Sequence, residues 1–344
     1  MQHYSDVFYA GLKEGARRSA EGIVPLILEW IQPKSVVDVG CGDGAWLAVF
    51  KERGVEDILG IDGDHVNRER LEIPTDRFMS LDLSQPVRLD RQFDLVLSLE
   101  VAEHLPAERA ELYIDSLTHL GPIVLFSAAI PFQGGTLHVN EQWPEYWVQL
   151  FEKKQYFVID CVRKQVWRNT TVEWWYAQNI LMFGNSGALQ NCAPLRTEYE
   201  LTRSSLLSVV HPRRYLEALE TQNALLETVW TLQTELTNRD IVETIPPGRA
   251  FILVDQGKLT YEPTAGRSAI PFLEKDGHYW GPPPDDSTAI LELERLRETG
   301  AIYMVFVWPA FWWLDYYVEL NCYLQVNFRC VLQNERLVVF DLSR

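Results

Sequence analysis

A glycine-rich turn that directly follows a short apolar strand constrains this 344-residue chain more than any other feature. The run VDVGCGDG, residues 37–44, ends a β-branched segment, and a helical apolar pattern follows over residues 45–53. Glycines in such a turn let the backbone approach a ligand without a Cβ atom in the way, and the helix N-terminus favours an anionic group such as a carboxylate. The sequence therefore predicts a ligand-binding turn between a strand and a helix.

Strand and helix patterns alternate through the first half of the chain. The predicted strands cover residues 35–39, 58–62, 77–81, 93–99 and 123–128. Helical stretches, such as residues 107–117, lie between them. This alternation predicts a parallel, doubly wound α/β sheet that binds its ligand at the carboxyl ends of the strands. Two longer strand-like segments, 156–167 and 172–183, flank a turn and predict a closing antiparallel hairpin.

Changes in periodicity divide the chain into three segments. The predicted segments are a first domain over residues 1–185, a helical linker over 186–245 and a small α/β accessory domain over 246–344. The linker contains a predicted helix over residues 212–238 with a rough apolar stripe. Such a stripe is suited either to a homodimer contact or to docking on a neighbouring domain, and its irregular heptads favour docking.

The GxGxG spacing after an acid resembles the first loop of the class I, Rossmann-like methyltransferases that depend on S-adenosylmethionine (SAM). It differs from the GxGxxG of dinucleotide-binding turns. The resemblance covers residues 1–185 and implies a seven-stranded Rossmann-like sheet, methyl transfer as the reaction and SAM as the cofactor. The residues that it assigns to the cofactor loop are Asp38, Gly40, Gly42 and Gly44. Asp38 and Gly40 match positions near the methionine end of SAM, and Asp38 is also suited to bracing the loop.

Two further acids extend the resemblance. Asp62 ends the second predicted strand, where the acid of the family accepts hydrogen bonds from both ribose hydroxyls of SAM. The neighbouring Gly63-Asp64 is also compatible with a plain surface turn at this point. Asp82 and Leu83, after the third strand, resemble the segment that lines the adenine, with the acid on the exocyclic amine and the apolar side chain on the ring.

The fourth predicted strand continues into EVAEH, residues 100–104, where the methyl acceptor is expected. Glu100, Glu103 and His104 share one face if a helix begins here, and His138 follows the fifth strand toward the same sheet edge. Two carboxylates and two imidazoles on one pocket are suited to a divalent cation such as magnesium or manganese, and imidazoles favour Mn²⁺, Fe²⁺, Co²⁺ or Zn²⁺ over Mg²⁺. The arrangement resembles the metal sites of small-RNA 2′-O-methyltransferases and the ExxEH of ubiquinone-pathway O-methyltransferases.

Three interpretations of this group of residues stay open. In the first, Glu100, Glu103, His104 and His138 bind a metal that makes an acceptor hydroxyl a better nucleophile. In the second, His104 or His138 acts as a general base without a metal, and Glu103 is a further catalytic candidate. In the third, the residues are structural. In both catalytic versions the enzyme mainly aligns an in-line displacement, because SAM already carries an activated methyl group.

A narrower resemblance concerns the acceptor. Residues 125–144, together with Tyr176-Ala177-Gln178-Asn179, resemble bacterial methyltransferases that accompany surface-polysaccharide and glycosyltransferase genes. This implies O-methylation of a sugar, nucleotide-sugar or glycan hydroxyl. Trp143, Trp147 and Tyr176 are suited to stacking on a sugar ring or to core packing. The Trp-rich runs 276–286 and 308–315 resemble an accessory region of some bacterial glycosyltransferases, and suit either carbohydrate binding or an aromatic core.

Composition limits the partners and the compartment. Forty-eight acids against 31 Lys and Arg give a net charge of −17, which speaks against a nucleic-acid partner held through its phosphates. Five cysteines without a paired CxxC spacing, and a polar N-terminus without an apolar leader, favour a cytoplasmic protein. The longest apolar run is too short to span a membrane.

Taken together, these patterns predict a cytoplasmic SAM-dependent methyltransferase whose C-terminal domain recruits or positions a glycan-type acceptor. One alternative is a non-catalytic SAM-binding sensor or scaffold that acts through the C-terminal domain. Another is a methyltransferase of a non-sugar small molecule. An NAD-dependent oxidoreductase is disfavoured by the spacing of the glycines.

Overall fold

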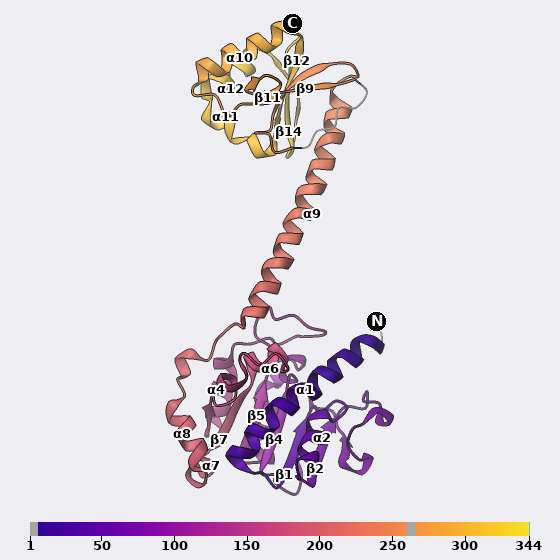
Figure 1. The fold of residues 1–344 in the computed structure, drawn as a ribbon, viewed down its shortest axis with the longest axis vertical. Helices are drawn as coiled ribbons and strands as arrows, with labels where there is room; N and C mark the ends of the chain where they lie inside the picture. Colours follow the sequence, from indigo (N-terminus) through magenta and orange to yellow (C-terminus); the bar gives the residue numbers. More distant parts are fainter. Residues whose placement is uncertain (1–5, 260–265, 344) are drawn as a thin grey trace. The chain divides into compact units, whose positions relative to one another are not determined.

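The fold is known from a computed structural model, which describes residues 6–259 and 266–343 (Figure 1). Contacts within the chain divide it into two units, Met1–Ala218 and Leu219–Arg344, here called unit 1 and unit 2. Helix α9, Pro212–Thr244, carries residues of both units. The predicted boundaries at 185 and 245, and a homodimer through residues 212–238, stay predictions.

Unit 1 is built on one seven-stranded sheet with the order β3-β2-β1-β4-β5-β7-β6. Its strands are β1 Ser35–Val39, β2 Asp57–Asp62, β3 Phe78–Ser80, β4 Leu95–Leu99, β5 Ile123–Ser127, β6 Tyr156–Ile159 and β7 Leu181–Asn185. The first five strands pair in parallel, and β7 is antiparallel to both of its neighbours. The predicted doubly wound, Rossmann-like α/β sheet is therefore confirmed.

Helices cover both faces of this sheet, which is why its central strands are apolar without alternation. Val36 of β1 and Leu95 of β4 belong to a core shared with α1 and α2, whereas Val37 and Val96 belong to a core shared with α3 and α4. The helices of unit 1 before α9 are α1 Asp6–Ile31, α2 Ala45–Glu52, α3 Ala110–Leu120, α4 Pro144–Lys153, α5 Arg163–Val166, α6 Trp174–Asn179, α7 Ser186–Asn191 and α8 Ala193–Leu201. The short 3₁₀ helices are η1 Arg68–Arg70, η2 Thr75–Arg77, η3 Ala102–His104, η4 Ala107–Arg109 and η5 Ser204–Leu206.

The expected closing hairpin is only half right. β6 and β7 do pair antiparallel, but the chain between them forms α5 and α6 instead of continuing two strands into a tight turn. The apolar residues Val162 and Val166 lie four positions apart and are both buried, so the helical turn directs both side chains to the core. The connection between α5 and α6 lies at the surface.

Unit 2 is a smaller α/β unit around a five-stranded sheet with the order β13-β14-β12-β8-β9. Its strands are β8 Ala250–Val254, β9 Ser268–Pro271, β12 Ala301–Val307, β13 Arg329–Gln333 and β14 Leu337–Asp341, with a separate pair β10 Glu274–Lys275 and β11 His278–Tyr279. Its other helices are α10 Asp286–Glu298, η6 Trp308–Ala310, α11 Trp312–Tyr316 and α12 Val318–Asn327. β8 is parallel to β12 and β9, whereas β14 is antiparallel to its neighbours, so the sheet is mixed.

Candidate active site

The glycine loop lies between β1 and α2 and is tied to the end of β2. The carboxylate of Asp62 accepts hydrogen bonds from the backbone N–H of Gly42 at 2.7 Å and of Gly63 at 2.6 Å. Gly42 adopts a φ of 53°, and a Cβ atom there would meet no atom within 4 Å, so the loop faces open space at this point. At Gly40 the reason for glycine is different, because a Cβ atom would lie 2.3 Å from the side chain of Val101. The loop is thus preformed and open toward a ligand.

Asp38 lies in β1 behind this loop and is buried. Burial raises the pKa of its carboxyl group to about 7, and the nearby charge of Asp62 adds to the shift. Asp38 and Asp62 therefore put two acids at the carboxyl edge of neighbouring strands. This arrangement is suited to a ligand that brings positive charge.

Asp82 and Leu83 follow β3 and lie on the outer side of the same edge. The Asp82 carboxylate is exposed and accepts a hydrogen bond from the backbone N–H of Ser84 at 2.9 Å. Hydrogen bonds from Ser84 lower the pKa of this carboxyl group. Leu83 packs on the core that α3 and α4 share. Their role toward the adenine of SAM stays a prediction.

The predicted helix from residue 100 does not form. Glu100 has a left-handed backbone conformation with a φ of 56°, and the short helix η3 begins only at Ala102. The Glu100 side chain accepts hydrogen bonds from Asn179 at 3.1 Å and from Gln133 at 3.1 Å. Glu100 is therefore held by side-chain amides, and its role as a metal ligand stays a prediction.

The loop after β5 brings His138 to η3. The backbone N–H groups of Val139 and Asn140 donate to the carbonyl oxygen of Glu103 at 2.9 and 3.0 Å. The Nδ1 atom of His138 lies 2.9 Å from the carboxylate of Glu141. When Nδ1 donates to this carboxylate, Nε2 carries the free lone pair, which is the form that binds a metal or accepts a proton.

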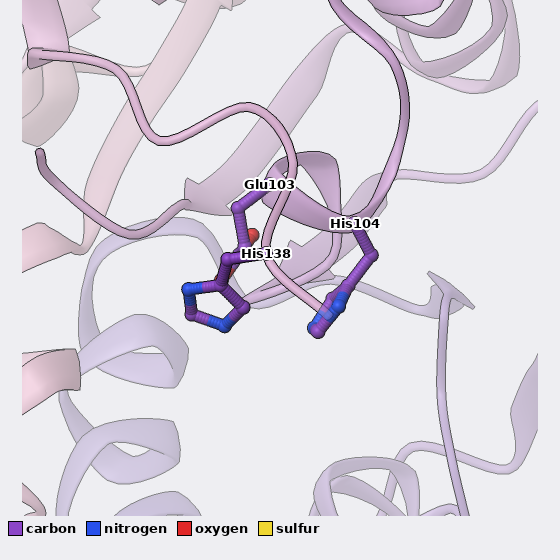
Figure 2. Close-up of side chains that lie close together, drawn as sticks. All are labelled: Glu103, His104 and His138. Carbon is purple, nitrogen blue, oxygen red and sulfur yellow. The ribbon is translucent and has the colours of Figure 1, made fainter. Parts of the chain in front are cut away.

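Glu103, His104 and His138 come together as a cluster, here called the EHH cluster. One donor atom from each side chain lies within 4.8 Å of the other two. Figure 2 shows the two imidazole rings side by side, with the Glu103 side chain next to His138. The rings meet edge to face with centroids 4.9 Å apart. The structure therefore brings together three of the four predicted metal-binding residues.

Glu103 is the unusual member of the EHH cluster. Its side chain is 0% exposed, and neither carboxylate oxygen has a hydrogen-bond partner among the described residues. Burial and the neighbouring Glu100 carboxylate raise the pKa of Glu103 well above its ordinary value. Desolvation and the neighbouring His138 lower the pKa of His104, which favours the neutral imidazole that can donate a lone pair. A mixed set of one carboxylate and two imidazoles fits a divalent transition metal.

The comparison with protein families decides what this unit is. Residues 12–178 match a family model described as a methyltransferase domain. Residues 12–178 therefore form a methyltransferase domain. The matched residues include the glycine loop, Asp62 and the EHH cluster.

The chain is also similar, at low identity, to solved structures of methyltransferases. DesVI of Streptomyces venezuelae is 16% identical with a TM-score of 0.41, and the match covers 53% of this chain and 96% of DesVI. The methyltransferase domain of a bacterial CtHen1 is 22% identical with a TM-score of 0.34, covering 46% of this chain and 93% of that domain. CalS10, an amino pentose methyltransferase from Micromonospora echinaspora, is 14% identical with a TM-score of 0.40. The match covers 54% of this chain and 99% of CalS10. Likeness at this level says nothing about the acceptor of this chain.

Two further findings concern curated proteins and membrane-spanning helices. No protein with a curated description matches the sequence significantly. Among the described residues, no helix combines the length and the apolar composition that crossing a membrane requires.

The aromatic residues of the methyltransferase domain divide between core and surface. Trp147 and Tyr176 are buried in the two cores, so neither is free to stack on a sugar ring. Trp143 is exposed, and so are Phe132 and Leu137 in the loop that carries His138. These exposed side chains, here called the apolar rim, lie on the loop between β5 and α4 that also carries His138.

In unit 2, the two tryptophan-rich runs contain both core residues and exposed residues. Trp313 is fully buried, whereas Trp280 and Trp312 are exposed. Asp285 caps helix α10 by accepting a hydrogen bond from the backbone N–H of Thr288 at 2.7 Å, which gives this acid a structural role. A carbohydrate-binding role of these runs stays a prediction.

The sequence patterns assign no role to three residues around the cluster. They are Glu141, which holds His138, and Gln133 and Asn179, which hold Glu100. Each lies on a loop or a short helix, where residue spacing does not fix the direction of a side chain. Only the position of Glu141, three residues after His138, hints at a contact.

Proposed function

We propose that the methyltransferase domain transfers the methyl group of SAM to a hydroxyl oxygen of a sugar-type acceptor, present as a sugar, a nucleotide sugar or a glycan. The observation that carries this proposal is the EHH cluster, which lies after β4 and β5 at the same sheet edge as the glycine loop after β1. The domain thus places a group that can take or polarise a hydroxyl proton at the edge where the methyl donor binds.

On the donor side, the chain supplies a preformed surface. Asp62 is positioned to accept hydrogen bonds from ribose hydroxyls, and the glycine loop leaves room for the methionine part. Asp38 and Asp62 favour the positively charged donor through their own negative charge. SAM, when bound, supplies a sulfonium whose methyl carbon is already activated.

On the acceptor side, the reaction is an in-line displacement. A bond forms between the hydroxyl oxygen and the methyl carbon, the bond between that carbon and sulfur breaks, and the hydroxyl proton leaves. His138 is the best-placed base, because Glu141 holds Nδ1 and leaves Nε2 free to accept that proton. His104 lies beside it with a lowered pKa and can take the same part.

The EHH cluster also fits a divalent cation. The orphaned carboxylate of buried Glu103 is the sharpest sign, since an unpaired buried carboxylate is costly unless a cation or a donor compensates it. Glu103, His104 and His138 would hold the ion, with an imidazole-rich set that favours Mn²⁺, Fe²⁺, Co²⁺ or Zn²⁺. Such an ion lowers the pKa of a coordinated hydroxyl and so makes it a better nucleophile.

The apolar rim supports an acceptor with an apolar face. Phe132 is 88% exposed and Leu137 is 80% exposed, although both are large hydrophobic side chains. Trp143 lies on the same loop. Sugar rings present C–H faces that pack on such side chains, and the net charge of −17 disfavours an acceptor bound along many phosphates.

The test is transfer of a labelled methyl group from SAM to a panel of nucleotide sugars and lipid-linked glycans, with and without Mn²⁺ or Mg²⁺. We expect transfer to at least one acceptor, loss of transfer in EDTA and recovery when the metal is restored. Activity that persists in EDTA would remove the metal and leave His138 as a free base. Tight SAM binding without transfer to any member of the panel would contradict a sugar-type acceptor.

A further inference from the structure

A cavity lies in unit 1, away from the glycine loop and the EHH cluster. Its volume is about 430 Å³, within the range of small-molecule sites. The surface link between α5 and α6 forms one wall, and the start of α9 forms the other. The lining residues are Trp167, Arg168, Asn169, Thr170, Val172, Trp174, His211, Pro212 and Arg213.

The charge of this cavity is opposite to that of the chain. The protein has a net charge of −17, yet two arginines and no carboxylate line the cavity. Arg168 is exposed and forms no ion pair within the described part of the chain, and Arg213 pairs only with the exposed Glu217, at 3.1 Å. Guanidinium groups bind phosphate oxygens in pairs, so this wall favours a phosphorylated ligand.

The same cavity offers an aromatic surface. Trp167 and Trp174 line it, of which Trp167 is half-buried and Trp174 is buried, and the ring of His211 lies 4.8 Å from that of Trp167. His211 is fixed in place, because its Nε2 atom lies 3.0 Å from the carbonyl oxygen of Trp167. Flat ligand rings stack on aromatic side chains of this kind, with about 1–3 kcal/mol per base in nucleic-acid complexes.

Hydrogen bonds connect the cavity to the catalytic residues. Gln178 accepts from the backbone N–H of His211 at 2.8 Å and donates to the side chain of Asn179 at 2.9 Å. Asn179 in turn donates to Glu100, which lies beside Glu103. Arg214, next to Arg213, donates to the carbonyl oxygen of Phe132 in the apolar rim. These hydrogen bonds therefore lead from the cavity wall to Glu100, which lies beside the EHH cluster.

We propose that this cavity binds the nucleoside diphosphate of a nucleotide-linked sugar, so that the sugar extends toward the EHH cluster. The inference rests on the proposed function and narrows its acceptor to this class. The two arginines bind the diphosphate, the half-buried Trp167 stacks on the base, and the sugar extends toward His138. An acidic enzyme can hold such an anionic acceptor only where arginines gather locally, as they do here.

The test is isothermal titration calorimetry of the full chain with UDP, GDP and ADP, and with the matching nucleosides. We expect at least one nucleoside diphosphate to bind at least tenfold more tightly than its nucleoside. The double variant Arg168→Gln/Arg213→Gln should weaken that binding at least tenfold. Arg53→Gln, which removes an exposed arginine outside the cavity, should leave it unchanged.

SAM binding, measured on the same samples, reports folding and the proposed function separately. Variants that keep SAM affinity but lose nucleoside diphosphate support the cavity as the site. If no nucleoside diphosphate binds while SAM does, the cavity assignment is overturned and methyl transfer still stands. Equal binding of diphosphate and nucleoside, or unchanged binding by the double variant, would also overturn it. If SAM does not bind, the proposed function fails independently of this cavity.

Discussion

Two buried carboxylates at the same sheet edge differ in how their oxygens are satisfied. Asp62 is buried at the end of β2, and each of its oxygens accepts a backbone N–H, from Gly42 and from Gly63. Glu103 is buried in η3, and neither of its oxygens has a partner within the described residues. The backbone around Glu103 is well bonded, since its carbonyl oxygen accepts from Val139 and Asn140.

The difference teaches which part of the site the chain completes by itself. Asp62 stabilises the glycine loop and presents its remaining lone pairs to a ligand, so it contributes to folding and to binding together. Glu103 costs stability in the unliganded protein, because an unpaired buried polar group loses its hydration without compensation. Asp62 therefore marks a preformed surface, and Glu103 marks a position that a ligand must complete.

The largest expected effect comes from replacing Glu103. Glu103→Met removes the unpaired carboxylate and keeps a similar volume, so we expect methyl transfer to fall by at least about 100-fold, the scale of losing a catalytic group. At the same time, the free energy of unfolding without metal should rise by about 1–3 kcal/mol, the cost of an unsatisfied buried group. Labelled-methyl transfer and thermal denaturation measure the two effects.

The matched control is Glu152→Met, which changes an exposed glutamate of α4 in the same unit. It should leave both measurements close to those of the unchanged protein. A Glu103→Met protein that loses stability would show that Glu103 already has a compensating partner. The contrast with Asp62 would then disappear.

The next effect concerns the residue that holds His138. Glu141→Gln replaces the carboxylate that lies 2.9 Å from Nδ1 by an amide, which no longer favours one imidazole tautomer. We expect methyl transfer to fall by about 10- to 100-fold, as is common when the partner of a ligating histidine is lost. NMR of ¹⁵N-labelled histidine should show a mixture of tautomers at His138, a signal that a purely structural role would not change.

Replacing Asp62 should have a smaller effect, and the effect should be on SAM affinity. Asp62→Asn keeps one acceptor oxygen but removes the charge, so SAM affinity should fall by about 1–2 kcal/mol, or about 5- to 30-fold. Calorimetric titration with SAM measures this change. Asp64→Asn, which alters the exposed acid two positions later, serves as the control and should bind SAM normally. Equal SAM affinity of Asp62→Asn and the unchanged protein would remove the ribose role of Asp62.

The sequence predicts the part of the site around Asp62 better than the part around Glu103. The β-branched strands and Asp62 lie in regular elements whose period fixes their faces, and the glycine loop joins two such elements, so the sheet follows from the pattern. The predicted face of Glu100, Glu103 and His104 assumed a helix from residue 100. Instead, the left-handed backbone at Glu100 turns that side chain toward Gln133 and Asn179.

Residues brought together from loops escape prediction for a related reason. Gln178 meets His211, and Asn179 meets Glu100, through contacts between segments far apart in the chain, and no local period records such contacts. The prediction of two long strands fails between β6 and β7 for the same reason. Val162 and Val166 pack into the core from a helical turn, and this packing is known only once the other core residues are in place.

The smallest expected effect concerns a third buried carboxyl group, that of Asp38 in β1. Burial and the charge of Asp62 raise its pKa to about 7, so it is neutral below that pH and charged above it. SAM is cationic and favours the charged form. SAM affinity should therefore rise by about threefold to tenfold between pH 6 and pH 8, as linkage requires for one proton released on binding.

In the absence of SAM, the contribution of Asp38 to the free energy of unfolding falls as the pH rises. A carboxyl group whose pKa is raised from 3.8 to about 7 on folding contributes stability below pH 4, and this contribution is lost as the pH rises through 7. Asp38→Asn should flatten both pH dependences. S-adenosylhomocysteine, which lacks the sulfonium charge, should show a weaker rise than SAM in the unchanged protein. Equal pH dependence for both ligands would mean that Asp38 does not respond to the sulfonium, and that Asp62 alone supplies the charge of the preformed surface.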